Sequence, residues 1–219
     1  MRAPSFSSFP SFPSALLALP LCAVALFGAV TPSPARADAT ATQYLKSKHD
    51  QVTRVLKAPS KDAAAKQARE EKVTALIAGL LDYATLSANA LPDHWNARSQ
   101  KERDEFVSLL RELVERNYRQ NLENTLGYSI KYVAEQPAGK GVIVSSTARD
   151  AKNKRSPEVT IDDQMEARGA EWVVIDVTTD GVSMVQNYRS QFRRIIEKDG
   201  WAGLVGRMKK RLADGGTAI

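Results

Sequence analysis

The stretch WVVIDVTTDGVSMVQNYRSQF, from Trp172 to Phe192, joins a strand to a helix and decides the fold. Its first part, residues 172–177, is almost entirely apolar, which is typical of a strand covered on both faces. Ser183 is a suitable N-cap for the helix that follows, because its hydroxyl can accept a hydrogen bond from a free N–H of the first turn. The apolar stripe of this helix has helical spacing and consists of Val185, Tyr188, Phe192, Ile195 and Ile196.

Three further strands are expected before this one in the chain. Residues 128–134 and 159–165 alternate between apolar and polar side chains, and residues 141–148 contain a short apolar run. Turn-forming residues separate the segments at 136–139, 152–157 and 168–170. We therefore expect a four-strand antiparallel meander.

Helices precede and follow this sheet. Apolar residues recur with helical spacing over 44–56, 62–81 and 99–127, and the third segment opens with a capping box formed by Ser99 and Glu102. Residues 82–98 contain Pro92 and are expected to be irregular. Two helices, at 185–200 and 204–215, are expected to close the chain. This order predicts an α+β domain in which helices pack on one side of a curved four-strand antiparallel sheet.

The first 37 residues have the features of a secretory signal peptide. Arg2 precedes a long apolar stretch, and residues 33–37 end in the small-x-small pattern that signal peptidase reads. The alternative is an uncleaved membrane anchor, but the stretch is somewhat short for a span of about 20 residues, and Pro20 interrupts it. We expect cleavage after Ala37, which leaves one domain over residues 38–219.

The composition argues against several classes of protein. The only cysteine, Cys22, lies within the leader, so the mature chain is expected to have no disulfide and no thiolate site. The formal net charge is +6, and loss of the leader removes Arg2 and Arg36 to leave +4. This charge is far below that of a typical nucleic-acid-binding protein. The sequence contains no G-x-G-x-x-G motif and no Walker loop, so no nucleotide site is expected.

Residues with catalytic or metal-binding potential are few. His49 and His94 lack the spacing of a metal-binding pair, and His49 is expected on the solvated side of its helix. A nucleophile elbow, G-x-S-x-G, requires glycine two residues after the serine, but Val185 stands at that position after Ser183. We expect no catalysis and no metal.

Asp176 is the one carboxylate that demands an explanation. It lies inside an apolar strand, where a carboxylate must be paired or hydrogen-bonded. We expect a structural ion pair with Arg189. The alternative is a catalytic acid with a perturbed pKa.

Residues 176–192 resemble the hallmark of the MlaC family, also called the toluene-tolerance family: Asp-Val, Gly-Val-Ser, an apolar pair, Asn-Tyr-Arg and Gln-Phe. A second block is similar to other landmarks of the family, and it comprises Leu81-Asp82-Tyr83, His94-Trp95, Phe106 and Tyr118. Residues 86–98 depart from the arginine-containing approach to the tryptophan that is usual there. The resemblance implies a periplasmic, non-enzymatic protein without a cofactor, which holds a phospholipid in an apolar cavity.

The resemblance also implies a set of partners. They are a phospholipid, an outer-membrane lipoprotein–porin complex, and an inner-membrane ABC transporter complex with its lipid-binding periplasmic subunit. The carrier would be a monomer that maintains lipid asymmetry of the envelope and binds no nucleic acid. A hopanoid-associated carrier of the same family remains an alternative. Outside the family, a small cone-shaped α+β hydrolase or isomerase and an adaptor between envelope complexes also remain open.

The closing helices carry many cations. They fit either a solvated helix face or docking to acidic surfaces or anionic headgroups. The residues are Arg193, Arg194, Lys198, Arg207, Lys209, Lys210 and Arg211.

Lipid contacts are expected between the helix at 99–127 and the sheet. The residues chosen are apolar or aromatic and lie on inward stripes or strands of the elements that would enclose a cavity in this family. They are Phe106, Leu110, Leu113, Tyr118, Tyr132, Val144, Val174 and Tyr188. On this view, Val144→Trp displaces lipid and leaves the fold intact.

Overall fold

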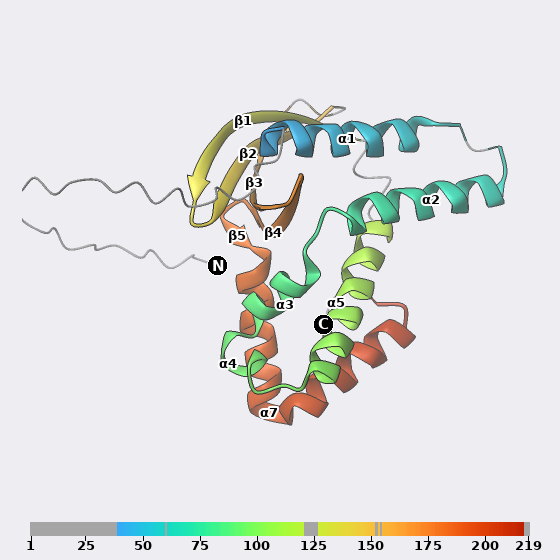
Figure 1. Ribbon diagram of the computed structural model, residues 1–219. Coiled ribbons are helices and arrows are strands. Elements are labelled where there is room, and N and C mark those ends of the chain that lie inside the picture. Colours follow the sequence, from blue (N-terminus) through green and yellow to red (C-terminus); the bar gives the residue numbers. More distant parts are fainter. Residues whose placement is uncertain (1–38, 60, 121–126, 152, 154, 217–219) are drawn as a thin grey trace, which may run out of the picture. The chain divides into compact units, whose positions relative to one another are not determined.

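The computed structural model describes residues 39–59, 61–120, 127–151, 153 and 155–216, which belong to one compact unit. The expected leader, residues 1–37, lies outside the described residues, as do residues 121–126 of the expected third helix. Helices come first, a sheet follows and a helix closes the chain (Figure 1). The helices before the sheet are α1 (Ala41–Lys57), α2 (Ala63–Ala78), α3 (Tyr83–Ala90), α4 (Pro92–Trp95) and α5 (Gln100–Gln120).

Side-chain caps fix where the first helices begin. Thr40 and Gln43 form a capping box at α1, and the Asp62 carboxylate accepts a hydrogen bond from the Ala65 N–H at the start of α2. Ser99 and Glu102 form the expected box ahead of α5, with the Ser99 N–H 2.8 Å from the Glu102 carboxylate. Each cap satisfies backbone donors that have no partner inside the helix.

The segment expected to be irregular, residues 82–98, contains two short helices. Asp82 caps α3 by accepting the Thr85 N–H at 2.9 Å. Pro92 is the first residue of α4, a position where the missing N–H costs nothing and the fixed φ suits a helix. The expectation of irregular chain was wrong because Pro92 begins a helix as well as ending one.

The sheet is antiparallel throughout, in the order β1-β2-β3-β4-β5. Its strands are β1 (Tyr128–Ala138), β2 (Gly141–Asp150), β3 (Val159–Arg168), β4 (Glu171–Thr179) and β5 (Val182–Ser183). The predicted meander is therefore confirmed, with β5 as a short fifth strand that was not expected from the sequence. It forms because Asp180 and Gly181 adopt positive φ and turn the chain back onto β4.

Strand β4 carries the sequence that decides the fold. Trp172 and Val174 point to the same face and are buried, as alternation requires. Ile175 is also buried, because the register shifts here: Met165 pairs with Val174 and Gln164 with Asp176, which leaves Ile175 as an extra residue. The expectation that this strand is buried on both faces holds only at the bulge. Val173, on the face opposite to Trp172 and Val174, is half-buried.

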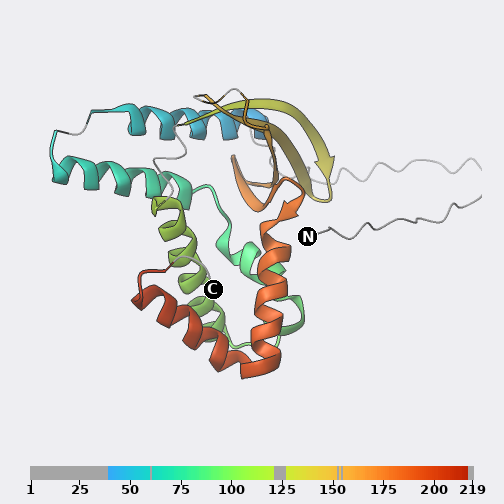
Figure 2. The same cartoon turned by 180° about the vertical axis from the view of Figure 1, so that it is seen from behind.

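The last helix, α7 (Met184–Ala213), begins at Ser183, whose hydroxyl accepts the Gln186 N–H as predicted. Gly200 interrupts it with a φ of 68° and bends the chain, so that the two predicted closing helices are the two arms of α7 (Figures 1 and 2). Lacking a Cβ, glycine adopts this conformation without the steric penalty of other residues.

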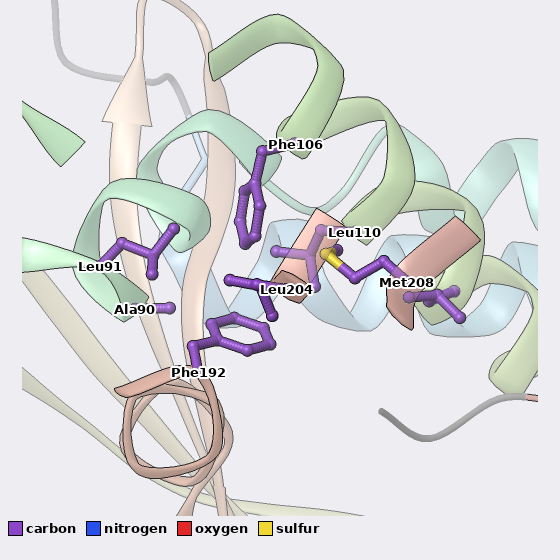
Figure 3. Packing of buried hydrophobic residues seen from close by; sticks show 8 residues of the cluster. Ala90, Leu91, Phe106, Leu110, Phe192, Leu204 and Met208 are labelled. Atoms are coloured by element: carbon purple, nitrogen blue, oxygen red, sulfur yellow. The ribbon is translucent and has the colours of Figure 1, made fainter. Parts of the chain in front are cut away.

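Two main apolar clusters form. The helical core joins α3, α5 and α7 and contains Ala90, Leu91, Phe106, Leu110, Leu113, Phe192, Leu204 and Met208 (Figure 3). Within it, the ring of Phe106 meets the ring of Phe192 edge to face at 5.4 Å. The sheet core joins α1 to the sheet and contains Ala41, Leu45, Val144, Met165, Trp172 and Val174.

Candidate functional site

A pocket of about 250 Å³ opens between α1, α2 and the inner face of the sheet. Its wall is mainly aliphatic and aromatic, with a few polar groups. The lining residues are Leu45, Lys48, His49, Val52, Leu76, Ile77, Leu80, Tyr118, Ile130, Tyr132, Ser146, Ile161 and Asp163.

The α1 side of the pocket follows from helical periodicity. Leu45, Lys48, His49 and Val52 are spaced i, i+3, i+4 and i+7, so they share one face of α1. Leu45 and Val52 are buried, whereas Lys48 and His49 are half-buried at the wall. The apolar stripe that the sequence shows on this helix thus covers the sheet and the pocket together.

Two long-range contacts hold the start of α1 on the sheet. The Thr42 N–H and hydroxyl both donate to the Glu135 carboxylate of β1, at 2.8 and 2.6 Å. The Trp172 indole N–H donates to the Ala39 carbonyl at 2.9 Å. The position of α1, and with it one wall of the pocket, is fixed by these bonds and by burial of Ala41 and Leu45.

The sheet side of the pocket follows from strand register. Tyr132 pairs with Ser146, and Ser146 pairs with Ile161, so these three residues stand in one row across β1, β2 and β3. Asp163 lies two residues beyond Ile161 and therefore on the same inner face. This alternation places a carboxyl group in a mainly apolar wall.

Burial perturbs three titratable groups of the pocket. It raises the pKa of Asp163 to about 7, with a further contribution from the neighbouring Asp162 carboxylate. Burial, together with the charges of Asp163 and Asp50, raises the pKa of Tyr132 to about 12. Burial lowers the pKa of His49, and Asp50 partly offsets this. His49 was expected in solvent, but its ring lines the pocket because it falls on the inward stripe of α1.

Two of the eight residues chosen from the sequence, Tyr118 and Tyr132, line the pocket. Phe106, Leu110 and Leu113 lie in the helical core, where each is at most 1% exposed. Tyr188 packs against that core, with its ring stacked on Phe192.

The remaining two of the eight, Val144 and Val174, lie in the sheet core. Lipid contact by any of the eight residues stays a prediction. Among the described residues, α5 gives the pocket Tyr118 alone, so α1 and α2 form most of the wall that was expected from α5.

Asp176 does not pair with Arg189. Its carboxylate accepts the backbone N–H groups of Val177 (2.8 Å) and Val185 (3.0 Å) and the Ser183 hydroxyl. Arg189 instead donates to the Asn89 carbonyl of α3 at 3.1 and 2.6 Å. The carboxylate thus has a structural role at the junction of β4 and α7, as expected, but with different partners.

Two features are absent from the described residues. No three His, Cys, Asp or Glu side chains in this part of the chain come together as a metal site. None of the helices described is long and apolar enough to cross a membrane.

Comparison with known proteins identifies the relatives of this chain. The solved structure of a phospholipid-binding protein from Ralstonia solanacearum, in complex with a phospholipid, superposes with a TM-score of 0.67. The match has 23% sequence identity and covers 81% of this chain and 99% of the other, which shows a shared fold. The family described as MlaC protein matches residues 46–210, three quarters of the sequence and nearly all of the described structure. The chain therefore belongs to the MlaC family.

Proposed function

We propose that the protein binds a phospholipid and holds acyl chain in the pocket between α1, α2 and the sheet. The observation that carries this proposal is a mainly apolar pocket within the folded domain, lined by side chains such as Val52, Ile77 and Ile161. Each methylene removed from water contributes about 0.8 kcal/mol, so a chain can bind without a dedicated polar anchor. The Ralstonia relative, which shares this fold, was solved with a phospholipid bound.

The wider role that we propose is transport through the periplasm. The carrier would exchange phospholipid between an outer-membrane lipoprotein–porin complex and an inner-membrane ABC transporter complex. Membership of the MlaC family supports this role. A hopanoid-type lipid is the alternative cargo, and the mass of the bound lipid distinguishes the two.

The cations of α7 do not favour a dedicated anionic docking face. Four of the seven lie within ion-pair distance of acids on α7, at its C-cap or on α5. These pairs are Arg193–Glu197, Arg207–Asp199, Lys209–Glu105 and Lys210–Asp214. A solvated, locally paired helix face therefore explains most of the positive charge.

We propose binding and not catalysis at this site. Asp163, a carboxyl with a raised pKa, lines the pocket together with Ser146 and His49. A hydrolase requires a nucleophile bonded to an oriented base, and among the described residues no hydrogen bond joins these three side chains. Asp176, the acid considered from the sequence, is bonded to the start of α7 and is not among the residues lining the pocket. A bound lipid that is recovered intact after long incubation would agree with this proposal, and hydrolysis products would contradict it.

The pocket must widen to take a whole phospholipid. Its volume of about 250 Å³ is below the range of ~300–1,000 Å³ for small-molecule sites. The walls most able to move are α2 and the part of α1 beyond its bonded start, because the strands opposite them are paired along most of their length, with one register shift between Tyr132 and Ala134. We expect lipid loading to move α2 and the far end of α1 away from the sheet, while the start of α1 stays bonded to it.

The test is native mass spectrometry of protein purified from cells, with two matched tryptophan variants. Ile161→Trp fills the pocket and should reduce bound lipid with little change in melting temperature. Val144→Trp overpacks the sheet core, where Val144 is fully buried, and should lower stability by about 1–3 kcal/mol. This replaces the expectation that Val144→Trp spares the fold. Full lipid occupancy in Ile161→Trp would show that the lipid lies elsewhere.

A further inference from the structure

Asp163 presents a carboxyl group to the pocket from an apolar part of the sheet. Its cross-strand partners are Val144 on β2 and Val177 on β4. The same face of β3 carries Ile161 on one side of it and Met165 on the other. No hydrogen bond or ion pair to the Asp163 carboxyl is found among the residues that the structure describes, so the open side of the pocket is its remaining source of hydration.

The neighbouring Asp162 has a different environment. It points to the other face of β3 and accepts the Ser145 hydroxyl at 2.6 Å. The two carboxylates therefore form a natural comparison: adjacent in sequence, one facing the pocket and one facing outward.

Charged and titratable groups reach the pocket from several elements. From α1 come Lys48 and His49, and the Lys48 ammonium lies 5.0 Å from the centre of the Tyr44 ring. Strand β1 contributes Tyr132 and α5 contributes Tyr118. On α2 and the turn after it, the lining side chains are apolar.

The electrostatic balance at Asp163 is dominated by burial. Burial and Asp162 both favour the neutral acid, and the pKa rises to about 7. No cation lowers it, although Lys48 and His49 line the same pocket. At neutral pH the group is therefore close to the midpoint of its titration.

We propose that occupancy of the pocket depends on protonation of the Asp163 carboxyl. An acyl chain is held when this carboxyl is neutral and is released when it ionises. This rests on the proposed function, since it concerns the same pocket. A chain lying against Asp163 removes the remaining water, and an ionised carboxylate without a partner is disfavoured in such surroundings. Binding consequently takes up a proton.

The sign of the pH dependence follows directly. Binding weakens as pH rises above the titration midpoint of the lipid-free protein, approaching a tenfold loss per pH unit. His49 acts in the opposite sense, because its protonation at lower pH would place a cation beside the chain. The pKa of His49 is lowered from 6.5, so the range from pH 7 to 8.5 isolates Asp163. The pKa of Tyr132, about 12, keeps that phenol neutral throughout.

The experiment measures binding of a phosphatidylglycerol with one fluorescent acyl chain to the purified protein at pH 7.0, 7.5, 8.0 and 8.5. We expect the affinity of the wild-type protein to fall about tenfold over this range. Asp163→Asn should bind with nearly constant affinity. Asp163→Leu, which introduces an apolar side chain of similar size, should also bind with nearly constant affinity. Agreement between the two variants shows that the result does not come from a folding defect in one of them. Asp162→Asn should retain the pH dependence, with its midpoint at slightly lower pH.

Proton uptake provides a second readout. Saturating the wild-type protein with this lipid in weakly buffered solution at pH 7.5 should consume protons, and Asp163→Asn should consume none. A pH dependence that persists in Asp163→Asn, or that disappears in His49→Gln, would overturn the proposal. Equal binding by the wild-type protein at every pH would overturn it and leave the proposed function standing. No binding by any variant at any pH would overturn both.

Discussion

Asp176 accepts three hydrogen bonds: those from the Ser183 hydroxyl and the Val185 N–H tie β4 to the start of α7, and the one from the Val177 N–H stays within β4. Asp176→Asn keeps one oxygen for the two backbone N–H groups, but it removes the charge and replaces the acceptor of the Ser183 hydroxyl by an N–H donor. Hydrogen bonds to charged groups contribute about 1.5–3 kcal/mol each. We expect the free energy of unfolding, measured in urea, to fall by about 1–3 kcal/mol, with lipid binding retained by the folded fraction. An unchanged urea midpoint would contradict this assignment.

Asp82 should contribute a pH-dependent part of the stability. Burial alone would raise its pKa, but hydrogen bonds from the Thr85 N–H and hydroxyl and the Arg168 guanidinium outweigh this, and the pKa is lowered. A carboxyl with a lowered pKa stabilises the fold above its unfolded-state pKa and loses that contribution on acidification. Asp82→Asn should therefore be less stable than the wild-type protein at pH 7, and the difference should shrink as pH falls below about 4. Thermal melts across this range measure it, and a constant difference would contradict it.

The environment of Asp176 was predictable from the sequence in part. That Asp176 must be hydrogen-bonded could be predicted, because a carboxylate in an apolar strand has no other stable arrangement. Its partners could not, since Arg189 satisfies a carbonyl at Asn89, 100 residues away in the chain. The place of Asp163 in the pocket could not be predicted either: its adjacency to Asp162 indicates opposite faces of a strand, but alternation alone does not say which face meets an open pocket.

Helix α1 is the element on which the pocket depends. Glu135→Ala removes the acceptor of both Thr42 hydrogen bonds and should loosen the start of α1. We expect faster amide hydrogen exchange in the first turns of α1 and a loss of stability of about 1 kcal/mol. Glu158→Ala is the matched control, because Glu158 is an exposed residue just before β3 whose partner is Arg149 and not α1. Equal exchange in α1 of both variants would show that apolar burial alone holds the helix.

Regular elements with strong periodicity were predictable, and the irregular connections were not. The stripes of α1 and α5 and the capping box at Ser99 follow from local chemistry and are present. The short helices α3 and α4 have too few turns to show a period, and their packing against α5 and α7 stabilises them instead. The two residues of β5 form because a turn brings them beside β4.

At the scale of the molecule, the pocket and the helical core are separate. Periodicity identifies the buried face of each element, but not whether facing surfaces meet completely. Phe106, Leu110 and Leu113 meet their neighbours and close the helical core, whereas Tyr118, farther along the same helix, reaches the pocket. One apolar stripe along a helix can thus contribute both to a closed core and to an open pocket. For this reason, some of the lipid contacts predicted from the sequence lie in the core and others line the pocket.

Asp163 lies in the pocket and not in the helical core. The pH dependence of the stability of the lipid-free protein should therefore report on its carboxyl group. A carboxyl whose folded-state pKa is raised to about 7, from about 3.9 when unfolded, favours the folded state while it is neutral. Its ionisation opposes folding increasingly between those two pH values and by a constant amount above the higher one. Asp163→Asn removes this effect. The stability of the variant relative to the wild-type protein should therefore rise between pH 4 and 7, by up to about 1.4 kcal/mol per pH unit, and then level off.

Urea unfolding of lipid-free protein at pH 4, 5.5, 7 and 8.5 measures the difference. Asp162→Asn is the control, because it keeps the Asp163 carboxyl and should keep the decline in stability with pH. A difference between Asp163→Asn and wild type that stays constant across the range would mean that the carboxyl titrates normally, and that the pocket is wet enough to hydrate it. The levelling-off above pH 7 distinguishes Asp163 from carboxylates such as Asp82, whose lowered pKa gives stability that is lost only at acid pH.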